Sequence, residues 1–158
     1  MPLVSLLLVY MAFAPQAALP AACLAYAAPE FCDTLAYFGG TLFGKRKLCP
    51  SISPKKTVAG SICALLGGGV FGAILIPLQR LWGGPVHPAV LIGVGLGCGV
   101  LSQFGDLFAS KLKRWAEIKD FSSVFPGHGG IMDRIDSMLF CGPLVLFVFT
   151  ILTKAHIY

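Results

Sequence analysis

Three long runs of apolar residues dominate the chain from its middle to its end. They cover residues 58 to 78, 88 to 109 and 138 to 157 and contain few charged side chains. An α-helix rises about 1.5 Å per residue, so roughly 20 residues cross the hydrocarbon core of a bilayer. Each run therefore predicts a membrane-spanning helix, the last one with local thinning of the bilayer or an extension toward Tyr158.

The N-terminal region is also apolar, but three prolines, Pro15, Pro20 and Pro29, and two acidic residues interrupt it. Residues 3 to 28 form one segment, and Pro29, Glu30 and Asp33 lie where a second one, residues 30 to 43, begins. We expect a span near 3 to 28 and a broken helix over 30 to 43. No basic residue precedes the first apolar run, so a retained membrane segment is expected rather than a cleaved signal peptide.

Composition agrees with this pattern. Of the 158 residues, 56% are hydrophobic and 12% are charged, against roughly a quarter charged in soluble proteins. This excludes a soluble enzyme as the default interpretation. The six cysteines form no Cys-x-x-Cys pair, so reduced side chains packed as small hydrophobes are expected. The sequence predicts an all-α fold, a polytopic transmembrane helix bundle forming a single domain over residues 1 to 158.

Lysine and arginine cluster in two connecting segments, and this distribution predicts the orientation. One cluster precedes the run at 58 to 78 and the other follows the run at 88 to 109, whereas the connection 79 to 87 carries only Arg80. Segments two spans apart lie on the same side, and short basic loops stay in the cytoplasm. Both clusters are therefore expected on the cytoplasmic side. A net charge of +5 placed in this way suits small phosphate substrates or lipid headgroups rather than nucleic acid.

Glycines recur within the two central runs, over residues 67 to 72 and 93 to 99. Small residues four positions apart let two helices approach closely. We expect them to serve helix packing, within one bundle or across a homodimer, rather than catalysis.

Three aspartates predict a metal site at the cytoplasmic side. Asp106 lies near the end of an apolar run, where a carboxylate should face a polar cavity and meet a cation or donor. Asp133 and Asp136 share one face if the chain is helical from Ile131, and they repel each other unless a metal ion or Arg134 neutralises them. Oxygen ligands favour a hard ion such as Mg²⁺, which completes its shell with substrate phosphates. Solvated charges at a helix end with a structural ion pair are the alternative.

Two segments are candidates for phosphate binding. Residues 125 to 130 are rich in glycine and contain His128, and their backbone N–H groups can approach an anion ahead of a helix N-terminus. In the other basic segment, Lys55 and Lys56 lie beside hydroxyl groups and can neutralise a triphosphate. The same two lysines can instead hold the segment on the cytoplasmic side and contact lipid headgroups. The charge pattern leaves both roles open.

A stretch of 27 positions, from residue 110 to residue 136, resembles the signature of the phosphatidate cytidylyltransferase family, also called CDP-diacylglycerol synthases. It consists of Ser110-Lys111-Leu112-Lys113-Arg114, Lys119-Asp120 and Phe125-Pro126-Gly127-His128-Gly129-Gly130-Ile131-Met132-Asp133-Arg134-Ile135-Asp136. Blocks at 33 to 44 and 53 to 60 fit the bacterial branch of the same family, except that Thr41 and Ala59 stand where it often has Arg and Glu. The resemblance runs from Leu24 to the C-terminus. Family members are longer, so the chain is expected to match their C-terminal catalytic half without the N-terminal helices.

The resemblance implies the reaction of CTP with phosphatidate to give CDP-diacylglycerol and pyrophosphate, with Mg²⁺ as cofactor and room for a second, monovalent cation. The implied catalytic group is Asp106, Lys119, Asp120, His128, Asp133 and Asp136. Within it, Asp106 and Asp133 bind the metal, Asp136 is a further ligand or supports one, and Asp120 orients a lysine or the metal's waters. The implied substrate-binding group is Asp33, Ser53, Lys55, Lys56, Thr57, Lys113, Arg114, Gly129 and Gly130.

Within the substrate-binding group, the lysines at 55, 56 and 119 and the Gly129-Gly130 backbone offset the triphosphate charge. Lys113 and Arg114 hold the phosphatidate headgroup while the acyl chains stay in the lipid. The implied location is the bacterial plasma membrane, with several spans, contacts with membrane lipids and catalytic loops facing the cytoplasm. Two alternatives stay open: a CTP-dependent lipid kinase, which attacks the terminal phosphorus, and a catalytically inactive membrane fragment.

Overall fold

The computed structural model describes residues 15–50, 52–81, 83, 86–118 and 132–154. Within these ranges the chain forms helices joined by short connections and one small hairpin. In chain order the elements are α2 (Pro15–Phe43), β1 (Lys47–Cys49), β2 (Ser53–Thr57), α3 (Val58–Leu81), α4 (Pro88–Trp115) and α5 (Met132–Lys154).

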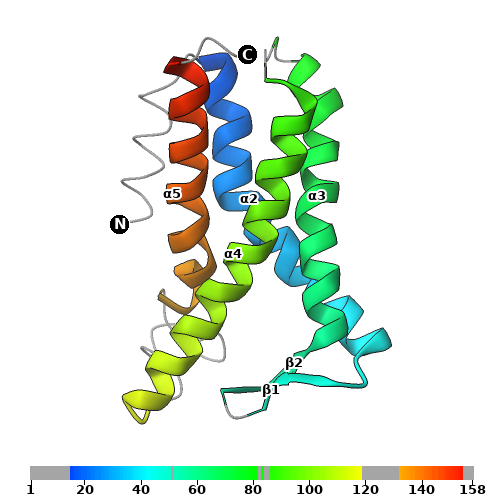
Figure 1. Ribbon diagram of the computed structural model, residues 1–158, viewed down its shortest axis with the longest axis vertical. Helices are drawn as coiled ribbons and strands as arrows, with labels where there is room; N and C mark the ends of the chain where they lie inside the picture. The colour runs from blue at the N-terminus through cyan, green and yellow to red at the C-terminus, as the bar shows by residue number, and fades with distance from the viewer. Residues whose placement is uncertain (1–14, 51, 82, 84–85, 119–131, 155–158) are drawn as a thin grey trace.

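The helices form a bundle in which α4 contacts α2, α3 and α5 (Figure 1). By length and composition, α3 and α4 are apolar enough to cross a membrane, and α5 contains a shorter apolar stretch, Ser137–Leu152. The expected all-α bundle is confirmed. Helix α4 runs six residues past the expected end of its span at 109, so Asp106 lies more than two turns before the end of the helix. The single domain over residues 1 to 158 stays a prediction.

Helix α2 differs from the two segments expected at 3 to 28 and 30 to 43. It continues from Pro15 to Phe43 with Pro20 and Pro29 in its interior, and it changes direction partway along its length (Figure 1). A proline inside a helix removes one hydrogen bond and bends the helix. Both interior prolines are fully buried, so packing holds the helix together where the sequence pattern predicted a break. Residues 3 to 14 of the expected first span lie outside the described residues.

The two glycine runs pack α3 directly on α4. A Cβ atom added at Gly68 would collide with the carbonyl oxygen of Gly95, and one added at Gly95 would collide with the carbonyl oxygen of Gly68. The two backbones therefore touch with no side chain between them. This confirms the packing role within one bundle, and the homodimer stays a prediction.

The two ends of the bundle differ in character. The β1–β2 hairpin and the C-terminal end of α4 lie at one end, and the C-terminal end of α3 and the N-terminal end of α4 lie at the other (Figure 1). Both basic segments thus begin at the same end, as the spacing of the spans requires. The hairpin was not expected; its strands are antiparallel, with Lys47 opposite Thr57 and Cys49 opposite Ser53. All six cysteines are free, as expected, and three of them are buried.

Candidate active site

A cavity of about 510 Å³ lies at the end of the bundle that carries the hairpin. Most of its lining surface is apolar, but charged side chains form part of the wall, and we call it the polar cavity. Helices α2, α3 and α4 and both strands contribute to its wall. The residues lining it are Asp33, Ala36, Tyr37, Gly40, Thr41, Gly44, Lys47, Lys55, Lys56, Thr57, Gly60, Ser61, Gln103 and Asp106. Its volume is in the usual range for small-molecule sites.

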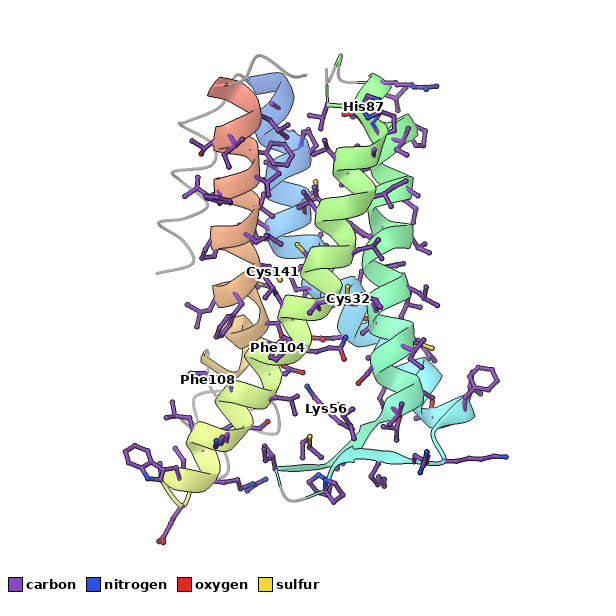
Figure 2. All side chains as sticks on the ribbon, in the orientation of Figure 1. Cys32, Lys56, His87, Phe104, Phe108 and Cys141 are labelled. Atoms are coloured by element: carbon purple, nitrogen blue, oxygen red, sulfur yellow. The ribbon has the colours of Figure 1, made fainter. Side chains whose placement is uncertain are left out.

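Lys56 and Asp106 form an ion pair inside this cavity. Lys56 Nζ donates a hydrogen bond of 2.6 Å to Asp106 Oδ2, and about a quarter of each side chain is exposed. The lysine comes from the hairpin and reaches toward α4 (Figure 2). A carboxylate in an apolar helix is costly unless a cation or donor meets it, and Lys56 supplies that charge.

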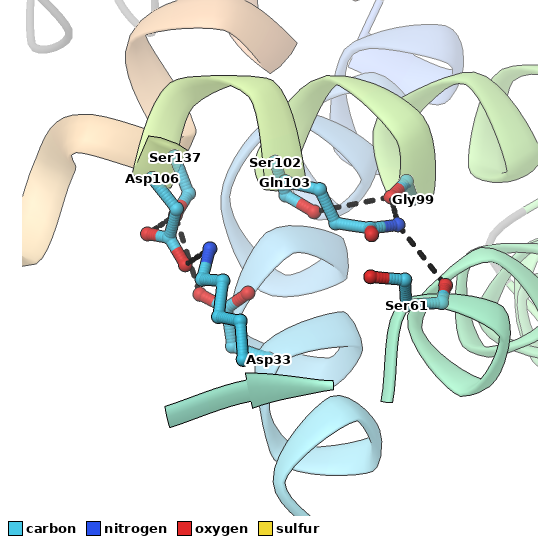
Figure 3. A network of polar contacts seen from close by, with 8 residues as sticks. Asp33, Ser61, Gly99, Ser102, Gln103, Asp106 and Ser137 are labelled. Carbon is cyan, nitrogen blue, oxygen red and sulfur yellow. Dashed lines mark hydrogen bonds and ion pairs between the residues drawn. The ribbon is translucent and has the colours of Figure 1, made fainter. Parts of the chain in front are cut away.

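Ser137, near the start of α5, links two aspartates that come from different helices. Its hydroxyl lies 3.0 Å from Asp106 Oδ1 and 3.2 Å from Asp33 Oδ2, within hydrogen-bonding distance of both (Figure 3). The serine is buried, with 3% of its surface exposed. Helices α2, α4 and α5 and strand β2 therefore converge on one polar cluster: Asp33, Lys56, Asp106 and Ser137.

The junction between β2 and α3 places Lys56 at this cluster. Thr57 directly precedes α3, and its Oγ1 accepts a hydrogen bond of 3.2 Å from the Gly60 N–H, as a residue capping a helix N-terminus does. Gly60 faces α2 so closely that an added Cβ would lie 2.7 Å from the carbonyl oxygen of Ala36. Close contact of α2 with α3 thus brings α2, which carries Asp33, beside strand β2, which carries Lys56.

The charges in the cavity favour a polyanionic ligand that brings a cation with it. The described residues that line the cavity include three lysines, at 47, 55 and 56, and two aspartates, Asp33 and Asp106. The two carboxylates lie close enough to share one hydroxyl. Neighbouring carboxylates attract cations, and lysines attract phosphate.

The structure brings five of the sequence-predicted residues together in the cavity: Asp33, Lys55, Lys56, Thr57 and Asp106. Ser53, Lys113 and Arg114 are described but do not line it. Lys119, Asp120, His128, Gly129 and Gly130 lie outside the described residues. Thr41 lines the cavity, and its uncharged hydroxyl donates to the carbonyl oxygens of Tyr37 and Phe38 of its own helix.

Asp133 and Asp136 belong to the first turn of α5, where the backbone is described and the side chains are not. Position 133 is four residues before Ser137, which puts the two positions on one helix face a single turn apart. In the part of the chain whose side chains are described, no three His, Cys, Asp or Glu residues form a group able to hold a metal ion. The set of three aspartates expected to bind Mg²⁺ therefore stays a prediction.

Sequence reasoning missed Ser137, Lys47 and Gln103 as site residues. Ser137 carried one usable signal, its place four positions after Asp133 at the start of an apolar helix. Lys47 was counted only as a charge in a basic loop, because no pattern indicated strand β1. Gln103 is the one amide side chain near Asp106 on α4; it donates hydrogen bonds to the carbonyl oxygens of Ser61 and Gly99, at 3.1 and 2.7 Å.

Comparison with known proteins identifies relatives of this chain. Over 115 residues the chain is 43% identical to the phosphatidate cytidylyltransferase of Staphylococcus aureus (strain COL), covering 72% of this chain and 42% of that protein. Over 117 residues it is 44% identical to the phosphatidate cytidylyltransferase of Bacillus subtilis (strain 168), covering 73% and 42%. The chain thus spans well under half the length of these relatives. Residues 1–152 match the model of the cytidylyltransferase family, and the chain belongs to that family.

Proposed function

We propose that this chain carries the catalytic site of a phosphatidate cytidylyltransferase, which converts CTP and phosphatidate to CDP-diacylglycerol and pyrophosphate. The observation that carries the proposal is the cluster of Asp33, Lys56, Asp106 and Ser137, drawn together from four segments. The first three of these residues line the cavity. The names of the S. aureus and B. subtilis relatives support the choice of substrates.

The reaction needs positioning and charge neutralisation more than a covalent nucleophile. A phosphate oxygen of phosphatidate attacks the α-phosphorus of CTP, the bond from that phosphorus to the β-phosphate oxygen breaks, and pyrophosphate leaves. The attacking phosphomonoester already carries negative charge near neutral pH. Lys47, Lys55 and Lys56 line the cavity and offset charge on the triphosphate and on the leaving pyrophosphate. Asp106 holds the Lys56 ammonium group in place for that role.

The donor set fits magnesium, which would supply charge neutralisation at the phosphates when bound. Asp33 and Asp106 offer hard carboxylate oxygens in one cavity. Among the described residues, Lys56 donates a hydrogen bond to Oδ2 of Asp106 and Ser137 donates one to Oδ1, and a carboxylate oxygen has two lone pairs. We include Asp133 as a further ligand because its position is one turn from Ser137 on the same helix face, with Asp136 beside it.

The proposed setting is the bacterial plasma membrane, with the cavity facing the cytoplasm. Two observations support it: α3 and α4 are long and apolar enough to span, and both basic segments begin at the end of the bundle that holds the cavity. Short basic loops stay on the cytoplasmic side. The homodimer and the second, monovalent cation stay predictions.

Product analysis tests the proposed reaction. We expect purified chain in detergent, given phosphatidate and Mg²⁺, to transfer label into lipid from [α-³²P]CTP and none from [γ-³²P]CTP. A lipid kinase would give the opposite pattern, and an inactive fragment would incorporate neither label. Removal of Mg²⁺ with a chelator should abolish incorporation. Equal incorporation by the native chain and Asp133→Asn would contradict the assignment of Asp133 to the metal.

Ser137→Ala is expected to lower the turnover rate about tenfold, because hydrogen bonds to charged groups contribute about 1.5–3 kcal/mol. Without the shared hydroxyl, Asp33 and Asp106 repel each other and lose their alignment. The matched control is Ser102→Ala, since Ser102 is fully buried and its hydroxyl bonds the Gly99 carbonyl of its own helix, outside the cavity. Steady-state rates at several Mg²⁺ concentrations measure the difference. Equal rates for the two variants would contradict a positioning role for Ser137.

A further inference from the structure

A second hollow, of about 350 Å³, lies on the outer side of the α3–α4 pair. We call it the α3–α4 groove. Its lining is almost entirely apolar and includes Ile62 and Leu65 from α3 and Val100, Phe104 and Leu107 from α4. Ile62 and Phe104 each expose more than half of their surface. In a membrane-spanning bundle, an apolar groove on the outside of two spanning helices opens toward lipid.

The groove adjoins the polar cavity. Ser61 and Gln103 line both, so the two spaces meet at these residues of α3 and α4. The Gln103 amide is fixed at this boundary by its hydrogen bonds to the carbonyl oxygens of Ser61 and Gly99 (Figure 3). Asp106 lies one turn along α4 from Gln103 in one direction, and Val100 lies about one turn away in the other. A charged residue that lines the cavity and an apolar residue that lines the groove thus lie within two turns of each other on the same helix.

We propose that the α3–α4 groove holds one acyl chain of the lipid substrate while its phosphate lies in the polar cavity. This inference rests on the proposed function. A diacyl phosphate has an anionic headgroup joined to long apolar chains. In the same way, a cavity with charged side chains adjoins an apolar groove. Lys55 and Lys56 stand on the polar side, and Leu65 and Val100 stand on the apolar side. Ser61 and Gln103 lie where the two spaces meet.

The direction of the groove also fits a lipid that stays in its leaflet. The groove begins beside the hairpin at Leu48 and extends along α3 to Leu65. The hairpin lies at the end of the bundle that holds the cavity, and α3 runs from there toward the opposite end (Figure 1). A lipid with its phosphate at Lys56 would therefore point its acyl chain toward the middle of the bilayer, with no reversal of orientation.

Crosslinking with a phosphatidate that carries a diazirine in one acyl chain tests the groove in the full chain, reconstituted in phosphatidylcholine vesicles. A phosphatidylcholine with the same diazirine chain reports contact with bulk lipid. We expect phosphatidate to label peptides 58–65 and 100–107 several-fold more than phosphatidylcholine does. Val100→Trp, which fills the groove, should remove the excess. Val70→Trp is the matched control, because Val70 is a similarly exposed valine of α3 that does not line the groove.

Kinetics give a second measurement. Val100→Trp should raise KM for phosphatidate about tenfold, as the loss of roughly two buried methylene groups would, and leave KM for CTP unchanged. Equal labelling by the two lipids, or an unchanged excess in Val100→Trp, would overturn the inference. If the native chain forms CDP-diacylglycerol while both lipids label the groove equally, the proposed function stands and the groove assignment fails. If it labels selectively but forms no product, the proposed function fails instead.

Discussion

Replacing Asp106 with Asn is expected to lower CDP-diacylglycerol formation by about 100-fold or more, the scale seen when one preorganised electrostatic partner is removed from an active site. Asn has nearly the same shape but no charge. It cannot hold the Lys56 ammonium group with an ion pair, and it is a weaker ligand for a hard dication. Because Asp106 also meets Ser137, the substitution disturbs the contacts of the carboxylate with Lys56 and with Ser137 at once. Rates with labelled CTP under saturating phosphatidate measure the loss.

Stability should change far less than activity in this variant. The Lys56–Asp106 pair is partly exposed, and such pairs contribute about 1 kcal/mol or less. The thermal midpoint in detergent should therefore stay close to the native value. Glu117→Gln is the control, since it neutralises an exposed acid just past the end of α4 and away from the cavity. A rate for Asp106→Asn within a few-fold of Glu117→Gln would show that the carboxylate has no part in the reaction.

The sequence predicted where helices lie better than where a helix is interrupted. Runs of apolar residues located α3, α4 and α5 because a bilayer-length helix needs little more than length and hydrophobicity. The fate of a proline inside a helix depends on what packs around it, and no local pattern records that. Pro29 therefore predicted a break, whereas the folded chain buries it within α2.

Charged residues in an apolar chain were also informative, more so than the uncharged Ser137. Asp106 was expected to meet a cation in a polar cavity because an isolated carboxylate among apolar residues is costly. Its partner Lys56 was one of several lysines in a basic segment, and the sequence did not set it apart from the others. In the fold, Thr57 caps the start of α3, and Lys56, which directly precedes it, reaches Asp106. Ser137 carries no charge, so its place between two aspartates from other helices became visible only in three dimensions.

Gly95→Ala is expected to destabilise the bundle by about 2 kcal/mol or more, within the range measured for overpacked interiors. The added methyl group would overlap the carbonyl oxygen of Gly68. Backbone cannot rotate away as a side chain can, so α3 and α4 must separate. Lys56 precedes α3 and Asp106 lies on α4, so the separation should also weaken their ion pair and lower activity. Thermal unfolding in one detergent, with rates measured in parallel, tests both effects.

Gly93→Ala provides a control on the same helix, two positions away. A Cβ at Gly93 meets nothing within 4 Å, and alanine is a better helix former than glycine by about 1 kcal/mol. This variant should therefore be as stable as the native chain or slightly more stable, with unchanged activity. Both variants replace glycine with alanine on the same helix, so the gain in helix propensity is similar in each. A difference in stability between them therefore measures the contact of α3 with α4. If Gly95→Ala unfolds at the same temperature as Gly93→Ala, then α3 and α4 do not touch at Gly68, and the alignment of Lys56 with Asp106 must have another cause.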